Sequence, residues 1–337
     1  MNYKDLEKSE KFKDGFLIKE FISSFCEKNC FYCALRKDRD FKREIVPPEK
    51  LAEKFHKMYK CGYASGLFLS SAILKDPEET QYLINKCAAI LRKKYLYKGY
   101  IHLKIMPGAD YEAIKEAVLY ADRVSLNFEA PKEIHLKNIS KDKNFKILFD
   151  TLIKIKRAYY ELKEKYRKIL PFGICTQFVY SPLKESDREY LEFTEFLYRK
   201  FRLSMVYFSR FIPVKGTPFE NLSEVSPLRE KRIYQANFLI RDYGFRLKDL
   251  VFDENGNLPL DKDPKVIYAE KNKHLFPIEI KKADYWLLLK VPGIGKKTAK
   301  NIITFRKMIN LNNIAHFVKN LEKVSDYILI DGKRVKA

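Results

Sequence analysis

Short apolar stretches alternate with longer amphipathic stretches along residues 16–244, and this alternation limits the folds open to the chain. Each apolar stretch has the length of a strand, and the stretch after it has helical periodicity. The expected strands cover residues 16–22, 66–70, 100–106, 123–128, 171–179 and 204–211. The expected helices cover residues 50–60, 77–94, 111–120, 145–170, 186–200 and 226–243. Alternating strands and helices predict a parallel α/β sheet, either doubly wound or closed into an incomplete barrel.

Three cysteines follow the first expected strand at C-x3-C-x2-C spacing: Cys26, Cys30 and Cys33. Cysteine thiolates hold iron–sulfur clusters, and a cluster of four irons usually takes four of them. With three thiolates close together and no obvious fourth, one iron stays free for a small molecule, much as a catalytic zinc keeps one open position. The loop therefore predicts a [4Fe–4S] cluster with an open iron.

Two other interpretations of this loop remain open at the level of sequence. A tetrahedral zinc site would need a fourth ligand, for which His56 or Cys61 is available in a helical stretch further along. Alternatively, the three cysteines are unmetallated core residues. The remaining cysteines, Cys61, Cys87 and Cys175, are scattered, and we interpret them as core residues.

The composition of the chain bounds its size, compartment and partners. Its 337 residues, 46% of them hydrophobic, are enough for one large domain and one small domain. Its net charge is +22. No apolar run reaches the roughly 18 residues of a membrane span, and the charged residues 1–14 do not resemble a signal peptide, so we expect a cytoplasmic protein. The positive charge favours a polyanionic partner, although an AT-rich genome or a hyperthermophilic source produces a similar composition.

The cysteine spacing resembles the signature of the radical SAM family, in which the open iron chelates S-adenosylmethionine. Tyr32 strengthens this resemblance, because the family favours an aromatic residue immediately before the third cysteine. The resemblance implies a partial (β/α)6 TIM-like barrel, a [4Fe–4S] cluster, and reductive cleavage of S-adenosylmethionine to a 5′-deoxyadenosyl radical. It also selects the incomplete barrel over the doubly wound sheet.

Polar residues near the ends of the expected strands are candidates for binding S-adenosylmethionine. Many family members carry a glycine-rich, acid-ended triad after the second strand, and this chain departs from that pattern with Ser70 and Ser71. Alternation places Ser125, Asn127 and Glu129 on one face of the fourth strand. The candidate set is Tyr32, Ser70, Ser71, Lys104, Asn127, Glu129 and Gln177. No catalytic acid or base stands out.

A second motif, residues 283–303, resembles the helix–hairpin–helix of nonspecific DNA-binding proteins. Two glycines make a tight turn, and a new helix begins near Lys296, so that backbone N–H groups are available to a phosphate. The candidate contacts are Gly293, Gly295, Lys296, Lys297, Thr298 and Lys300. A helical hairpin used for internal packing or for binding protein is the alternative.

The two motifs together resemble the radical SAM family assigned to DNA modification or repair, whose members are encoded beside a uracil-DNA-glycosylase-like protein. Supporting stretches are residues 66–71, 99–109, 211–214, 232–245 and the hairpin. The resemblance implies a nucleic-acid substrate, DNA before RNA, with a ferredoxin or flavodoxin as reductant. RNA modification and a non-catalytic iron–sulfur DNA-binding protein are the alternatives. We expect a polar lead-in (1–14), the barrel (15–244), a linker (245–280) and a small all-α helix–hairpin–helix domain (281–337).

Overall fold

The computed structural model describes residues 10–12 and 15–336, and the chain divides into two compact units. The first unit comprises Met1–Glu185 and Phe196–Val225, and the second comprises Ser186–Glu195 and Ser226–Ala337. The expected lead-in, residues 1–14, lies outside the described residues except for β1 (Glu10–Phe12).

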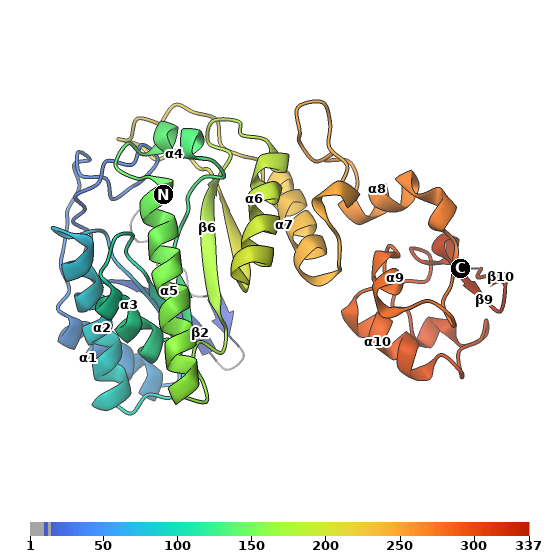
Figure 1. Cartoon of the computed structure of the whole chain (residues 1–337), viewed down its shortest axis with the longest axis horizontal. Helices are drawn as coiled ribbons and strands as arrows, with labels where there is room; N and C mark the ends of the chain where they lie inside the picture. Colours follow the sequence, from blue (N-terminus) through green and yellow to red (C-terminus); the bar gives the residue numbers. More distant parts are fainter. Residues whose placement is uncertain (1–9, 13–14, 337) are drawn as a thin grey trace. The chain divides into compact units, whose positions relative to one another are not determined.

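The first unit is built on a sheet whose six parallel strands are arranged in sequence order, with β1 antiparallel at the edge. The parallel strands are β2 (Gly15–Phe21), β3 (Ala64–Ser70), β4 (Tyr100–Lys104), β5 (Arg123–Ser125), β6 (Ile174–Tyr180) and β7 (Met205–Arg210). The sheet is open between its first and last strands and curls into a half-barrel (Figure 1). The expected partial barrel is therefore confirmed for this part of the chain.

Helices connect consecutive strands and pack beside one another in chain order. In the first unit they are α1 (Pro48–Lys60), α2 (Pro77–Lys93), α3 (Tyr111–Tyr120), α4 (Glu133–Ile139) and α5 (Phe145–Lys165). The side chains of Asp76, Asp110 and Asn144 cap the first turns of α2, α3 and α5, which explains where these helices begin. Helix α6 (Asp187–Phe201) is shared between the two units.

Several elements of the first unit differ from the sequence-based expectation. Helix α5 ends at Lys165 rather than at residue 170, and β6 begins at Ile174 rather than at residue 171. Strand β5 ends at Ser125 rather than at residue 128, and the backbone at Glu129 is left-handed, with a φ of 65°. Helix α4 was not expected, because its seven residues are too few for a clear periodicity.

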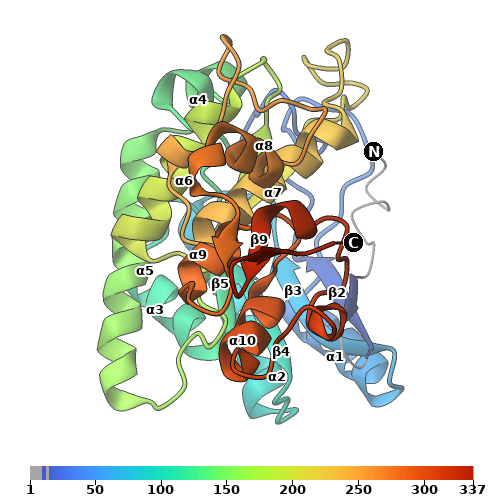
Figure 2. The same ribbon diagram turned by 90° about the vertical axis from the view of Figure 1, so that its right-hand side faces the viewer.

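The second unit contains α7 (Pro227–Asp242), α8 (Pro264–Lys271), α9 (Tyr285–Lys290) and α10 (Lys296–Phe305). It also has a three-stranded sheet of β8 (Ile278–Glu279), β9 (Ile328–Ile330) and β10 (Lys333–Arg334), coloured dark orange to red in Figure 2. The expectation of an all-α terminal domain is therefore wrong.

The expected linker, residues 245–280, is also folded. Asp263 caps α8, Pro264 occupies its first turn, and Tyr268 and Ala269 are buried.

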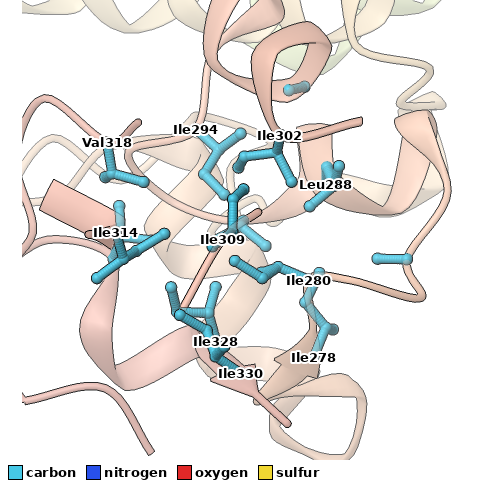
Figure 3. Close-up of a cluster of buried hydrophobic side chains, with 14 of the residues drawn as sticks. Ile278, Ile280, Leu288, Ile294, Ile302, Ile309, Ile314, Val318, Ile328 and Ile330 are labelled. Carbon is cyan, nitrogen blue, oxygen red and sulfur yellow. The ribbon is translucent and has the colours of Figure 1, made fainter. Parts of the chain in front are cut away.

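A cluster of buried aliphatic side chains forms the core of this second unit (Figure 3). Ile294 from the glycine turn and Ala299 from α10 are 1% and 0% exposed, as expected for residues that pack the two hairpin helices together. Ile328 and Ile330 of β9 belong to the same cluster, so the sheet and the hairpin share one core. No helix among the described residues has the length and apolar character needed to cross a membrane.

Candidate functional site

The cysteine loop leaves the carboxyl end of β2 and is fixed there by backbone hydrogen bonds. The Ile22 amide donates to the Ser70 carbonyl and the Ala72 amide donates to the Ser23 carbonyl, so the loop begins beside the end of β3. Active-site groups of parallel barrels gather at this end of the strands. The three cysteines therefore lie where the fold places its chemistry.

A single arginine holds the loop in shape. The Arg43 guanidinium donates hydrogen bonds to five backbone carbonyls of the loop, those of Ser24, Leu35, Arg36, Lys37 and Arg39. These bonds order a segment that has no helix or strand of its own. Sequence analysis did not single out Arg43, because its partners are carbonyls that any residue would provide.

The three thiols form one electrostatically linked group. Burial raises the pKa of Cys33 to about 12, and the neighbouring Cys30 and Cys26 contribute to that rise. All three cysteines are free of disulfides, and Cys30 is 6% exposed. Sulfurs so placed cannot all ionise unless positive charge compensates them, and a metal centre provides it by displacing the thiol protons.

A mononuclear zinc site does not fit this arrangement. In the described part of the chain, no three His, Cys, Asp or Glu side chains are close enough together to hold one ion. His56 stacks on Tyr95 with ring centroids 4.2 Å apart, and Cys61 is exposed after α1, towards the amino ends of the strands. A cluster distributes its thiolates over different irons, so its ligands need not converge on one point.

A buried charged network lies against the cysteines. Glu129 is 6% exposed and its carboxylate accepts hydrogen bonds from the Lys143 ammonium, at 2.8 Å, and from the Tyr32 hydroxyl. Burial alone would raise the pKa of Glu129, but the charges of Lys143 and Lys104 and these hydrogen bonds outweigh it and lower the pKa. Burial and the Glu129 charge raise the pKa of Tyr32, so this phenol stays a neutral donor.

The pKa of Lys143 is raised in this network, whereas the pKa of Lys104 is lowered. Burial alone would lower the pKa of Lys143, but Glu129 and the nearby Cys30 raise it, so Lys143 carries its charge. Burial lowers the pKa of Lys104 to about 8, only partly offset by Glu129. The site therefore contains one fixed cation and one amine that titrates near neutrality.

Polar side chains also line up across three neighbouring strands. Lys104 on β4 is in register with Ser125 on β5, and Ser125 is in register with Cys175 on β6. The Ser125 hydroxyl is buried and has no hydrogen-bond partner within the described residues. Burial raises the pKa of Cys175 to about 11, and its sulfur is 3.7 Å from the His102 ring. Cys175 is 1% exposed and is thus a core residue, as expected, with Ser125 between it and Lys104 in the sheet.

The other residues expected to bind S-adenosylmethionine are Ser70, Ser71, Asn127 and Gln177. Ser70 ends β3 and is 8% exposed, whereas the Ser71 hydroxyl donates to the neighbouring Ala72 carbonyl at 2.6 Å. Gln177 accepts the Glu129 amide on its backbone carbonyl. Asn127 follows the end of β5, so the alternation expected for Ser125, Asn127 and Glu129 is interrupted by the left-handed backbone at Glu129.

A surface hollow of about 390 Å³ lies at the opposite, amino end of the strands. Arg92 lines it, but its guanidinium already bonds the carbonyls of Tyr97, Gly99 and Tyr120 and the Asp122 carboxylate. Its charge is therefore committed to holding the loops before β4 and β5, and the hollow offers no comparable group of reactive side chains.

In the second unit, helices α9 and α10 form a hairpin around the two glycines. Gly293 has a φ of 82°, and a β-carbon there would lie 2.6 Å from Val324. Asp284 caps α9, but α10 begins at Gly295 with no side-chain cap. The first N–H groups of α10 are therefore open to an external acceptor.

The hairpin lysines differ in how free they are. Lys296 lies 3.4 Å from Asp242, which neutralises part of its charge. Lys297 and Lys300 are exposed, and neither has an ion pair with any described residue. Thr298 is half-buried on the first turn of the same helix. Two lysines and an open helix end therefore share one surface.

Comparison with known proteins finds relatives of the first unit. The model of the radical SAM superfamily matches residues 21–197. The [FeFe] hydrogenase maturase subunit HydE of Thermotoga maritima is 28% identical over 143 residues, which are 42% of this chain and 39% of HydE. The chain thus matches well under half of that relative's length.

Two solved structures share the fold. The FeFe-hydrogenase maturase HydG from Carboxydothermus hydrogenoformans aligns with a TM-score of 0.53 and 15% identity, over 66% of this chain and 50% of HydG. Methylornithine synthase (PylB) aligns with a TM-score of 0.50 and 16% identity, over 68% of this chain and 64% of PylB. At these identities the likeness concerns the fold alone.

The family match extends over more than half of the chain and includes the cysteine loop, Glu129 and Lys143. It sets aside the interpretation of the chain as a non-catalytic protein. The chain belongs to the radical SAM superfamily, and it is an enzyme whose cofactors are a [4Fe–4S] cluster and S-adenosylmethionine.

Proposed function

We propose that this radical SAM enzyme modifies nucleic acid, with DNA as the favoured substrate. The observation that carries the proposal is the hairpin of the second unit. An uncapped helix end and two lysines that form no ion pair with any described residue share one surface there. A helix N-terminus of this kind binds phosphate through its N–H groups, and lysines add charge without reading bases. The net charge of +22 is consistent with a polyanionic partner.

In this proposal Cys26, Cys30 and Cys33 hold the cluster. Their support is the shared electrostatic environment of the three thiols and their place at the carboxyl end of β2. Tyr32 anchors the loop through its hydrogen bond to Glu129. Together the cofactors supply a 5′-deoxyadenosyl radical, the species that the sequence resemblance implies.

The polar groups around Glu129 bind S-adenosylmethionine. A carboxylate that is ionised and buried can accept from an ammonium group, and the amine of Lys104 can pair with a carboxylate. Ser70, Asn127 and Gln177 complete the polar lining, while Ser71, whose hydroxyl is already used, contributes through its backbone. A base to be modified must leave the duplex stack to reach such a site.

The first experiment measures 5′-deoxyadenosine after anaerobic reconstitution with iron, sulfide, S-adenosylmethionine and dithionite, with and without duplex DNA. We expect more product with DNA. Lys297→Ala/Lys300→Ala should keep the basal rate and lose the increase. A matched control, Lys319→Ala/Lys333→Ala, removes the same charge from exposed positions outside the hairpin and should keep it.

The chain offers a direct binding signal for the same test. Trp286 is the only tryptophan, it lies on α9, and it is 56% exposed. Its fluorescence should change on titration with DNA. If neither the fluorescence nor the product responds to DNA, the substrate proposal is wrong. RNA that competes better than duplex DNA would redirect it to tRNA or rRNA.

Two protein partners belong to the proposal. A ferredoxin or flavodoxin would replace dithionite as the electron donor. A uracil-DNA-glycosylase-like protein is the second candidate, on the strength of the family resemblance alone, and adding one to the assay tests whether it raises turnover.

A further inference from the structure

Residues 139–143 run from the last residue of α4 towards α5 and contact the cysteine loop, and we call this segment the clasp. The Phe31 amide donates to the Ile139 carbonyl at 2.9 Å. The Asn29 amide donates to the Asp142 carboxylate at 2.8 Å. Both bonds fix the backbone on either side of Cys30. The clasp therefore holds the loop in place from a position more than a hundred residues further along the chain.

Ser140 of the clasp contacts a cysteine sulfur directly. Its Oγ lies 3.2 Å from the Cys30 Sγ, and Ser140 is 0% exposed. A thiolate has no proton to give, so with Cys30 ionised the hydroxyl must be the donor. Water cannot replace a donor at a fully buried position, so this bond has no substitute from solvent.

The clasp also ends in a cation. Lys143 pairs with Glu129 at 2.8 Å, and the charges of Cys30 and Cys33 act on the same ammonium group. The side chains of Lys143 and Glu129 are 15% and 8% exposed, so solvent screens this pair little. The backbone amides of Lys28 and Leu35 donate to the sulfurs of Cys26 and Cys33, each at 3.4 Å. The clasp adds a side-chain donor, Ser140, at Cys30 and one compensated ion pair.

These groups bear on the reduction potential of the cluster. A [4Fe–4S] cluster with three thiolates gains one negative charge when it accepts an electron. Hydrogen bonds to the sulfurs and nearby charge are among the factors that set the potential. A donor or a cation stabilises the more negative, reduced state and raises the potential, and an anion lowers it.

We propose that the clasp sets the reduction potential of the cluster, with Ser140 raising it through Cys30 and the Glu129–Lys143 pair adjusting it by charge. Ser140 is a positioning residue, since it acts through Cys30. The inference rests on the proposed cysteine ligands and not on the nucleic-acid substrate. It gives Ser140, Glu129 and Lys143 a role beyond holding the loop.

The test is an anaerobic potentiometric titration of the reconstituted protein, followed by electron paramagnetic resonance, without S-adenosylmethionine. Ser140→Ala should shift the reduced-to-oxidised equilibrium about tenfold towards oxidised, which is about 59 mV for one electron. Glu129→Gln should shift the potential in the opposite direction, because it removes a buried negative charge. Ser140→Thr keeps the hydroxyl and should stay near the parent potential.

Ser65→Ala is the matched control, since its hydroxyl lies on β3 towards the amino end and has no partner among the described residues. It should leave the potential unchanged. Iron and sulfide content is measured for every variant. If Ser140→Ala fails to hold a cluster, the direction in which Glu129→Gln shifts the reduction potential decides whether the inference stands.

An unchanged potential in Ser140→Ala, or a negative shift in Glu129→Gln, overturns the inference. Failure of the ligand assignment looks different, because Cys30→Ala would then retain a full cluster.

Discussion

The cysteine end of the first unit and the hairpin of the second unit differ in whether their polar groups are buried and paired or exposed. Around Cys30 the polar side chains are buried and bonded to one another, as Ser140 and the Glu129–Lys143 pair illustrate. At the hairpin, the first N–H groups of α10 have no side-chain cap, and Lys297 and Lys300 are exposed with no ion pair to any described residue. Buried polar groups are costly unless paired, and exposed ones stay available for contacts with other molecules.

This contrast separates two kinds of site. A closed network fixes a group that stays with the protein, because its geometry is complete before any substrate arrives. An open helix end supports a reversible contact whose strength depends on salt and on the charge of the partner. The first unit therefore has the character of a cofactor centre and the second that of a binding surface.

The strongest test of this separation removes one cysteine. Cys30→Ala should reduce 5′-deoxyadenosine formation at least about a thousandfold, because the cluster loses one of three protein ligands. The same variant should still bind DNA, as followed by Trp286 fluorescence. Iron content and product are measured on one preparation. Full activity in this variant would contradict the assignment of the cluster ligands.

A second test breaks the buried network without touching a cysteine. Lys143→Gln leaves the Glu129 charge buried and short of its partner, and should lower the free energy of unfolding of the metal-free protein by about 3 kcal/mol. Urea unfolding measures it. Glu129→Gln/Lys143→Gln removes both charges and should recover most of the loss.

A surface pair provides the control for that test. Lys57 and Glu53 form an ion pair on α1 with side chains 73% and 53% exposed. Lys57→Gln should cause no measurable change in unfolding, because water and salt already screen this pair. If Lys143→Gln and Lys57→Gln lowered the free energy of unfolding equally, burial would not explain the contribution of the Lys143 pair to stability.

The hairpin region has a buried lysine of its own, Lys265, which gives a pH-dependent test. Lys265 donates to the Ile294 carbonyl at 2.6 Å, and burial lowers its pKa to about 7. In the unfolded chain a lysine keeps its proton up to about pH 10.4. The unfolded state therefore binds more protons between these values, and the free energy of unfolding should rise with pH across that window.

The size of that rise is limited and can be assigned to one residue. A single group changes the unfolding free energy by at most about 1.4 kcal/mol per pH unit. Lys265→Met should remove the rise that Lys265 contributes, as measured by urea unfolding at pH 7, 8.5 and 10. The same slope in the parent and the variant would assign the pH dependence to other groups.

Local patterns account for what the sequence could predict. The three cysteines and the glycine turn each span only a few residues, so the chemistry of each could be predicted from the local sequence. Ser140 and Lys143 could not be found in this way, because they reach Cys30 and Glu129 only after the chain has folded. The helix in the expected linker did leave a signal, since Asp263 and Pro264 form a typical helix start.

The two hairpin glycines provide the finest test, because they should separate folding from binding. Gly293 has a left-handed backbone, and a β-carbon there would meet Val324 at 2.6 Å. Gly295 has a φ of −100°, and its β-carbon would meet only the Tyr243 hydroxyl, at 3.7 Å. Gly293→Ala should therefore lower the free energy of unfolding by about 1–3 kcal/mol, and Gly295→Ala should leave it nearly unchanged.

Binding should follow the reverse order in the folded proteins. A methyl group at Gly295 stands where a phosphate would approach the N–H groups of α10, so Gly295→Ala should weaken DNA binding by about tenfold, or 1.4 kcal/mol. Trp286 fluorescence measures the affinity and urea unfolding the stability of each variant. If Gly295→Ala binds DNA as tightly as the parent, the helix end is not the phosphate site, and the lysines alone would have to account for binding.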